Sequence, residues 1–258
     1  MLTLLSPAKK QAMASVNRLP DTTSIRFREE TQALISCLQP LSLEELSKLM
    51  SISDQLAHLN HERFAHFDPQ FATATNMFPA VLYFQGDAYK TLDAATFTTE
   101  QSAFCQQHLA ILSGLYGILR PYDNIQPYRL EMKTRLTTPL GNSLYTFWGN
   151  KLAQHLNQQL TNHKHPYVIN LASSEYSQAI DMSALDHPMI TVHFKEPHDE
   201  GYRVIGIHAK KARGLMTRHI ITQALDTPES IQGFNAHGYR FQPQLSSDST
   251  YIFHRNHN

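Results

Sequence analysis

The sequence is poor in cysteine and in long apolar runs, and each shortage excludes a class of protein. Its 258 residues include two cysteines, Cys37 and Cys105, which form no C-x-x-C pair. Two distant cysteines are typical of a reducing compartment and argue against a zinc site built on thiolates. No stretch approaches the roughly 18 apolar residues of a membrane span, and the opening run MLTLL is too short for the core of a signal peptide. We therefore expect a cytoplasmic protein with no membrane partner.

Charge is also scarce. Charged residues make up 17% of the chain, and 22 basic residues balance 22 acidic ones, so the net charge is zero with histidines neutral. This balance excludes a protein coated in positive charge, and any nucleic-acid binding must come from a local patch. Hydrophobic residues make up 41%, which indicates a folded globular chain rather than a disordered one.

Short apolar runs alternate with segments of helical periodicity. The runs that predict strands are 1–5, 80–84, 167–171, 189–194, 202–209, 239–241 and 251–254. Apolar residues at helical spacing predict helices over 25–38, 42–67, 99–116, 144–160 and 210–225. This order predicts a mixed α/β (α+β) fold, in which helices flank a mixed sheet. We expect a single compact domain over residues 1–258, with the helices of residues 25–70 as a candidate separate lobe.

The strongest local charge lies in the segment YRVIGIHAKKARGLMTRHIITQAL. It contains no carboxylate and five basic residues, which are Arg203, Lys210, Lys211, Arg213 and Arg218. On a helical wheel, Lys210, Lys211 and Arg218 share one face. Cations near the start of a helix oppose its dipole, and a bound anion would offset that cost. We interpret this helix as a phosphate-binding element; the alternative is a solvated polar face.

Two glycines and two arginines follow a predicted helix in the segment HLAILSGLYGILRPYDNIQPYRLEM. Gly114 and Gly117 resemble the turn of a helix-hairpin-helix module, whose backbone N–H groups bind phosphate. The match is imperfect, because two residues separate the glycines instead of one and Pro121 disfavours an immediate second helix. The alternative is a glycine-capped turn. We expect Arg120 and Arg129 to face an anion near the basic helix.

Polar side chains follow three of the predicted strands. Ser6 and Lys9 follow the first strand, Asp87 follows the second and Glu175 follows the third. Because ligands collect at the carboxyl ends of parallel strands, these four residues would share one cleft if the strands are parallel. Asp87, Glu131 and Glu175 are the candidate catalytic residues, since a carboxylate among cations is ionised and can act as a base or nucleophile. The alternative is that these carboxylates cap turns or form salt bridges, Glu131 with Arg129 or Arg120 and Glu175 with Lys9.

Two other patterns predict no chemistry. Residues 6–9 match the S-x-x-K pattern of penicillin-binding enzymes, but the companion K-T-G element is absent. His58, His61 and Glu62 share a helix face, which offers too few convergent ligands for a metal. We predict no metal site and no cofactor.

Distinctive blocks occur along the whole chain, namely LLSPAK, LMSISDQLA, FQGDAY, LSGLYGILRPYDNIQPYRLEM, LYTFWG, INLASSEY, AKKARGLMTRHII and GFNAHGY. With these blocks in this order, the chain resembles the YaaA peroxide-stress family of bacteria. The resemblance implies a cytoplasmic protein of the peroxide response that limits unincorporated iron and the DNA damage it drives. It also implies DNA binding through a helix-hairpin-helix element and a positively charged cleft, with no established reaction.

The resemblance and the residue patterns point to the same side chains. The residues expected to bind DNA or phosphate are Ser6, Lys9, Gly114, Gly117, Arg120, Arg129, Lys210, Lys211, Arg213 and Arg218. We expect a monomer that binds duplex or distorted DNA without strong sequence specificity. The alternative is an enzyme that acts on a nucleotide or on a base in DNA with the cleft carboxylates.

Overall fold

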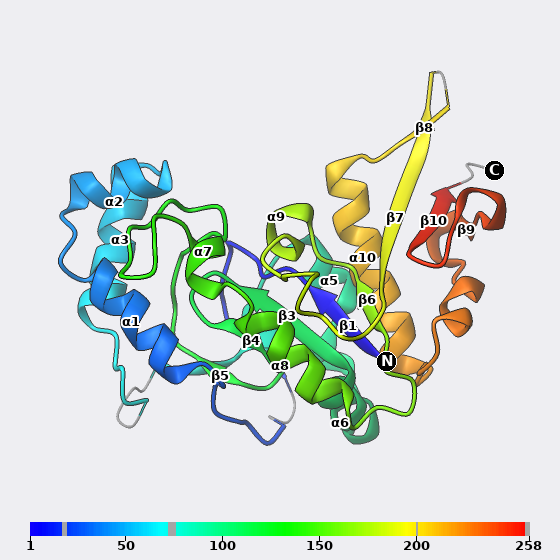
Figure 1. Cartoon of the computed structure of the whole chain (residues 1–258), viewed down its shortest axis with the longest axis horizontal. Helices are drawn as coiled ribbons and strands as arrows, with labels where there is room; N and C mark the ends of the chain where they lie inside the picture. The colour runs from blue at the N-terminus through cyan, green and yellow to red at the C-terminus, as the bar shows by residue number, and fades with distance from the viewer. Residues whose placement is uncertain (17–19, 72–75, 200, 256–258) are drawn as a thin grey trace.

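A sheet with a parallel centre runs through the middle of the protein (Figure 1). The computed structural model describes residues 1–16, 20–71, 76–199 and 201–255. The strand order is β4–β3–β1–β6–β7–β10–β9, with β8 paired to β7. Their bounds are β1 (Leu2–Leu5), β3 (Leu109–Ser113), β4 (Gly117–Leu119), β6 (Val168–Asn170), β7 (Met189–His198), β8 (Gly201–Arg203), β9 (Tyr239–Phe241) and β10 (Thr250–Arg255).

The five central strands, β3, β1, β6, β7 and β10, run parallel to one another. The strands at the two ends of this order, β4 and β9, pair antiparallel with β3 and β10. Every residue of β1, β3 and β6 is buried, as is typical of parallel strands covered on both faces. In β7, buried and partly exposed residues alternate, so this strand has only one face in the core. The prediction of a mixed α/β fold is confirmed. A separate pair, β2 (Phe78–Pro79) and β5 (Asn124–Ile125), lies outside this sheet.

Helices cover the sheet, and α1 to α3 lie together at one end of the molecule (Figure 1). The helices are α1 (Arg28–Leu38), α2 (Leu43–Met50), α3 (Asp54–Ala65), α4 (Ala80–Tyr83), α5 (Asp87–Leu92), α6 (Thr99–His108), α7 (Leu144–Trp148), α8 (Lys151–Leu160), α9 (Ser174–Ser177) and α10 (Gly206–Thr222). The predicted start at Ser42 is confirmed, since Ser42 and Glu45 form a capping box. Among the described residues, no helix is both long and apolar enough to cross a membrane.

The predicted helix over 99–116 is wrong beyond His108. There the chain enters β3, whose residues pair in parallel with β1. A fully buried strand shows no alternation of apolar and polar residues, so its sequence can resemble a helix. Here the pairing with β1 decides that the segment is a strand. β3 then pairs antiparallel with β4. The predicted helix-hairpin-helix element is therefore a β-hairpin in this structure.

Gly114 and Gly117 are buried in this hairpin and serve close packing. A Cβ atom on Gly114 would lie 2.4 Å from the carbonyl oxygen of Leu130. Gly117 has a φ of +69°, and its Cβ atom would lie 2.8 Å from the ring of Trp148. The Trp148 indole Nε1–H also donates to the Gly114 carbonyl at 3.1 Å. Neither glycine lies on the surface, where a phosphate could contact it, which corrects the prediction that they bind one.

Four other predicted elements differ from the structure. The predicted helix over 42–67 is broken after Met50 into α2 and α3, because Ser51 has a φ of +52°. The apolar run at 80–84 forms the short buried helix α4 instead of a strand, an ambiguity that periodicity cannot resolve in so short a run. The predicted helix over 144–160 is interrupted at Gly149, whose φ is +48°. The predicted strand over 202–209 ends at Arg203, and α10 begins at Gly206. The hairpin of β7 and β8 itself is confirmed.

Candidate functional site

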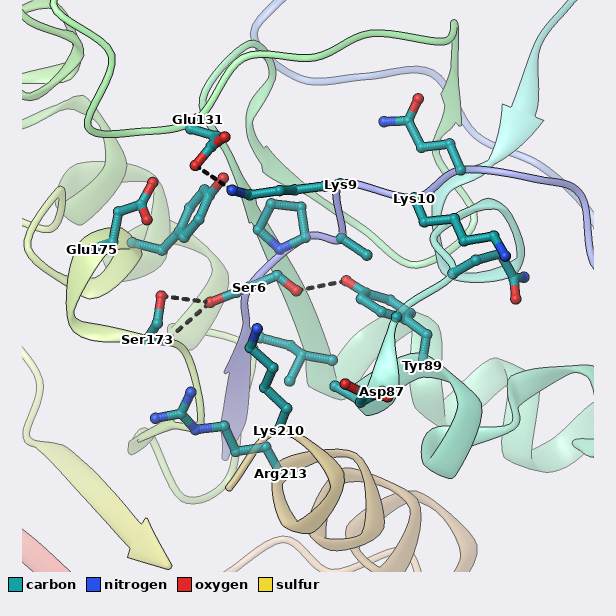
Figure 2. Close-up of a pocket in the computed structure, with 18 of the residues that line it drawn as sticks. Ser6, Lys9, Lys10, Asp87, Tyr89, Glu131, Ser173, Glu175, Lys210 and Arg213 are labelled. Atoms are coloured by element: carbon teal, nitrogen blue, oxygen red, sulfur yellow. Dashed lines mark hydrogen bonds and ion pairs between the residues drawn. The ribbon is translucent and has the colours of Figure 1, made fainter. Parts of the chain in front are cut away.

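A cavity of about 470 Å³ opens where β1 and β6 end (Figure 2). The residues after β1 and after β6 form two of its walls, as expected for parallel strands whose carboxyl ends meet at one edge. The start of α5, the segment 128–133 and one face of α10 complete the lining. We call this cavity the edge pocket.

The edge pocket brings together most of the residues singled out in the sequence. Those that line it are Ser6, Lys9, Asp87, Arg129, Glu131, Glu175, Lys210 and Arg213. The four strand-end residues do share one cleft, although the element before Asp87 is α4 and not a strand. The structure places Gly114, Gly117, Arg120, Lys211 and Arg218 outside the pocket lining.

Ser6 joins three walls of the pocket. Its hydroxyl accepts a hydrogen bond from the backbone N–H of Ser173 at 2.9 Å and donates to the Ser173 hydroxyl at 3.3 Å. Its carbonyl accepts a hydrogen bond from the Tyr89 hydroxyl at 2.9 Å. Ser6 therefore fixes the β1 end against the β6 end and α5.

Glu131 lies among three cations. Its carboxylate oxygens are 2.8 Å from Lys9 Nζ, 3.3 Å from an Arg129 nitrogen and 3.8 Å from Lys133 Nζ. Burial raises the pKa of this carboxyl, but the hydrogen bond and charge of Lys9, with the charges of Arg129 and Lys133, outweigh it and lower the pKa. Of the salt bridges considered from sequence, the one with Arg129 is present.

The opposite side of the pocket holds cations of a different kind. Lys210 extends from α10 toward Ser6, and Arg213 lies below it (Figure 2). Among the ion pairs of the described residues, none involves either side chain. The Nε atom of Arg213 is buried without a hydrogen-bond partner, and burial lowers the pKa of this guanidinium. A buried N–H without an acceptor is costly, so the Nε–H of Arg213 favours a bound anion on this side of the pocket.

Two carboxylates of the pocket, Asp87 and Glu175, are likewise absent from the ion pairs of the described residues. Glu175 accepts one long hydrogen bond, 3.4 Å, from the backbone N–H of Lys133. The sequence alternative of a salt bridge between Glu175 and Lys9 is wrong, because Lys9 pairs with Glu131. Both carboxylates therefore keep capacity to accept hydrogen bonds from a ligand.

Arg120 has a structural contact set. Its guanidinium donates to Asp123 at 2.8 and 3.0 Å and to the Ser24 carbonyl at 3.0 Å. Asp123 is fully buried, so Arg120 neutralises a carboxylate that water does not reach. The structure therefore places Arg120 on Asp123 and outside the edge pocket, and not beside the basic helix where the sequence analysis expected it.

The basic helix divides its cations between different environments. Lys210 and Arg213 face the edge pocket, while Lys211 is exposed outside it. Arg218 donates to the carbonyls of Leu92 and Asp93 at 2.9 and 3.0 Å, which ties α10 to the end of α5. The face predicted from the helical wheel, with Lys210, Lys211 and Arg218 together, is not the face that lines the pocket.

A second, open cavity of about 510 Å³ adjoins the edge pocket and shares Lys9, Arg129, Glu131 and Lys133 with it. We call it the side groove. The two cavities hold four cations that sequence reasoning missed: Lys48 and Arg135 in the side groove, Lys10 in the edge pocket and Lys133 in both. The run RLEMKTR, with three cations around one carboxylate, was the available signal for two of them.

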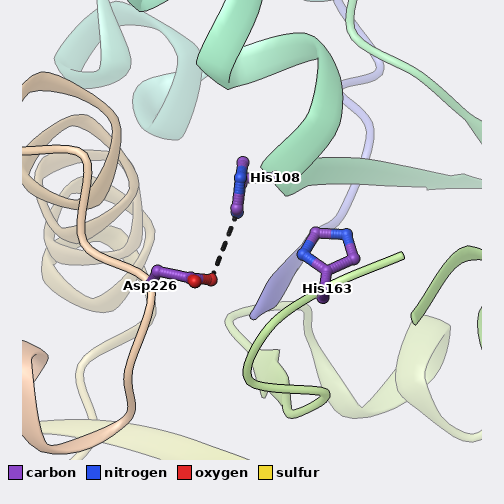
Figure 3. Close-up of side chains that lie close together, drawn as sticks. All are labelled: His108, His163 and Asp226. Carbon is purple, nitrogen blue, oxygen red and sulfur yellow. Dashed lines mark ion pairs between the residues drawn. The ribbon is translucent and has the colours of Figure 1, made fainter. Parts of the chain in front are cut away.

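Three other side chains that line neither cavity, His108, His163 and Asp226, lie close together (Figure 3). Ligand atoms of His108, His163 and Asp226 lie within 4.8 Å of one another. The Met1 amino group lies 2.6 Å from Asp226 Oδ1 and 3.1 Å from His163 Nδ1, and the Met1 carbonyl lies 2.8 Å from His108 Nδ1. Burial, followed by the charge of the Met1 amino group, lowers the pKa of His163 to about 4. A cation therefore already lies among these side chains, and the cluster anchors Met1 beside β1.

The two cysteines are free thiols, with Cys105 buried and Cys37 half-buried. Burial raises the pKa of both thiols. Since the thiolate is the reactive form, neither side chain is poised as a nucleophile.

The fold and the site thus define a mixed α/β protein with a cationic pocket at the carboxyl ends of its parallel strands. The chain belongs to the family described as peroxide stress protein YaaA, whose model matches residues 1–245. Its curated relatives are described as UPF0246 proteins. A protein of Caulobacter vibrioides (strain NA1000 / CB15N) is 44% identical over 255 residues, which cover 99% of both chains. Relatives from Paraburkholderia xenovorans (43% over 257 residues, covering 99% of this chain and 98% of the relative) and Legionella pneumophila strain Philadelphia 1 (42% over 257 residues, covering 100% of both) are similar along their length.

Proposed function

We propose that this chain binds DNA in the peroxide-stress response and limits iron-driven damage to that DNA. It acts as a monomer in the cytoplasm and binds duplex or distorted DNA without strong sequence specificity. The family supports the stress role. The observation that carries DNA binding is the local charge of the edge pocket, which has six cationic side chains and three carboxylates in a chain of zero net charge.

The side groove extends this charge beyond the pocket. Lys48, Lys133 and Arg135 lie there with Glu131 as the only carboxylate of its lining. Cations along a groove neutralise successive phosphates and release counterions, which gives affinity independent of base sequence. The buried glycine hairpin has no part in this binding, and Arg120 and Arg218 keep their structural contacts.

Fluorescence anisotropy with a labelled duplex across a salt series tests the proposal. Affinity should fall steeply between about 50 and 200 mM salt. The double variant Lys133→Gln, Arg135→Gln should flatten the salt slope by up to about two, roughly one for each lost phosphate contact. Lys164→Gln, on an exposed loop outside both cavities, is the control. Affinity that does not change with salt would refute DNA binding through these cations.

A second candidate function is an enzyme that acts on a nucleotide or on a base in DNA. It rests on Asp87 and Glu175, which line the pocket without an ion pair among the described residues. Carboxylates beside a phosphate site weaken binding unless they contact the ligand or do chemistry. DNA recovered after incubation and weighed by mass spectrometry tests this function. A mass change that Asp87→Asn or Glu175→Gln abolishes would establish it, and unchanged DNA would leave a binding protein.

A further inference from the structure

We infer that the edge pocket holds one nucleotide, whose phosphate lies against Lys210 and Arg213 and whose base carries an exocyclic amino group. This inference rests on the proposed function and deepens it, because it assigns a ligand to the pocket that the DNA contacts surround. The nucleotide is either free or extruded from a strand.

The size of the cavity is the first argument. At about 470 Å³ the edge pocket falls within the range of small-ligand sites, roughly 300 to 1,000 Å³. It is much larger than an inorganic phosphate needs. It is too small for a stretch of duplex, and proteins that hold a base in such a pocket take it out of the stack.

The cations without partners set the position of the phosphate. The guanidinium of Arg213 can bind two phosphate oxygens side by side, a geometry for which arginine is suited. Its Nε–H is buried and has no hydrogen-bond partner in the part of the chain that the structure describes. Lys210 points into the same space from the preceding turn of α10 (Figure 2). A phosphate between them would supply the missing acceptors.

The carboxylates favour a ligand that has hydrogen-bond donors as well as a negative charge. Asp87 and Glu175 line the same cavity and would repel a simple phosphate. A nucleotide offers them donors, because carboxylates accept hydrogen bonds from exocyclic amino groups of bases and from sugar hydroxyls. Among the described residues, Lys210, Arg213, Asp87 and Glu175 form no ion pair, so the pocket suits a ligand that has both an anionic and a donor end.

Three buried tyrosines supply flat apolar walls for a base. Tyr89, Tyr128 and Tyr176 line the pocket and are each less than a tenth exposed. The Tyr89 hydroxyl is held by the Ser6 carbonyl, and the Tyr128 hydroxyl lies 2.7 Å from the Ser113 hydroxyl. Because these two hydroxyls are engaged, the rings of Tyr89 and Tyr128 have fixed positions against which a base can pack.

The side groove favours a nucleotide that belongs to a strand. It meets the edge pocket at Lys9, Arg129, Glu131 and Lys133. Phosphates on either side of an extruded nucleotide would lie along this groove and its cations. A free nucleotide would use the pocket alone.

Two binding measurements test the inference. The first is calorimetric titration of the protein with dAMP, compared with inorganic phosphate. The second is the emission of 2-aminopurine, placed unpaired in a labelled duplex, which rises when this base leaves the stack. Lys210→Gln and Arg213→Gln are the test variants. Lys211→Gln is the matched control, because it removes the same charge from the next position of α10 but lies outside the pocket lining.

The expected result is that dAMP binds more tightly than phosphate and that each test variant weakens its binding at least about tenfold, as loss of a charged hydrogen bond predicts. Lys211→Gln should change dAMP binding less than about twofold. Because Arg213 is half-buried, circular dichroism checks its fold, and the exposed Lys210 gives a second variant that leaves the core intact. Rising 2-aminopurine emission would show that the nucleotide comes from a strand; dAMP binding without it would show a free nucleotide.

Other outcomes overturn the inference. Equal affinity for phosphate and dAMP, or equal loss in Lys211→Gln, would mean that the pocket binds anions without recognising a nucleotide. Salt-dependent duplex binding with no response to dAMP or 2-aminopurine would refute the nucleotide and leave the proposed DNA function standing. Binding of dAMP without any duplex binding would refute the DNA function and leave the nucleotide pocket.

Discussion

The contact between α5 and α10 can be tested by Gly214→Ala, because these helices position both sides of the edge pocket. Asp87 begins α5, while Lys210 and Arg213 lie on α10. Gly214 is buried where the two helices cross. A Cβ atom there would lie 1.9 Å from the carbonyl oxygen of Ala88 and 2.2 Å from the hydroxyl oxygen of Thr91.

The expected cost follows from these distances. Ordinary contact begins near 3.4 Å, so the helices must separate by about 1.5 Å at this point. Separation on this scale breaks the hydrogen bond from the Thr91 hydroxyl to the Lys211 carbonyl, 2.8 Å in the native structure. Overpacking costs about 3 kcal/mol and the lost bond about 1 kcal/mol, while the better helix propensity of alanine returns about 1 kcal/mol. The net loss of stability is about 3 kcal/mol.

Thermal and urea unfolding measure this loss. For a chain of this size, the melting temperature should fall by about 6 to 12 °C. Gly206→Ala is the matched control, because Gly206 begins the same helix and its Cβ atom would meet nothing within 4 Å. That control should be neutral or slightly stabilising. Equal stability of Gly214→Ala and Gly206→Ala would refute the close contact between α5 and α10.

Two further predictions concern ion pairs outside the pocket. Arg120→Ala should destabilise the protein by about 3 to 5 kcal/mol in urea unfolding, because it leaves the buried Asp123 carboxylate without its cation. Unchanged stability with weaker DNA binding would instead return Arg120 to the phosphate-binding residues. Burial raises the pKa of Asp226, but the hydrogen bond and charge of the Met1 amino group outweigh it and lower the pKa. Its contribution is therefore present above the unfolded pKa, about 3.9, and is lost as pH falls through the lower folded pKa. Asp226→Asn should cost about 2 kcal/mol at pH 7, and this difference should shrink in unfolding measured below about pH 4; a constant difference would contradict the ion pair.

Several features follow from local signals in the sequence, without any tertiary contact. Residues 1–5 and 167–171 read as strands because they are short apolar runs bounded by turn residues, and both are strands at the centre of the sheet. Ser42 marked a helix start through its own side chain. The polar residues just after the strands, Ser6 and Glu175, reached one pocket because parallel strands end at a common edge.

Other features depended on contacts between distant segments. Residues 109–113 have helical spacing by themselves and become a strand only because β1 supplies hydrogen-bond partners on one side and β4 on the other. The run at 80–84 is too short for periodicity to separate a buried helix from a buried strand. The sequence also could not show that Asp123 is fully buried. Only this burial makes Arg120 its necessary partner.

The basic helix shows the division most clearly. Its composition, five cations and no carboxylate over residues 202–225, was visible in the sequence and indicated an anion nearby. At about 100° per residue, Lys210 lies about 100° from Lys211 and about 60° from Arg213, so a broad helix face can hold either pair. Which face meets the pocket depends on how α10 packs against α5 and the sheet. The sequence by itself determined that this segment is cationic, and only the tertiary structure decided which two cations line the pocket.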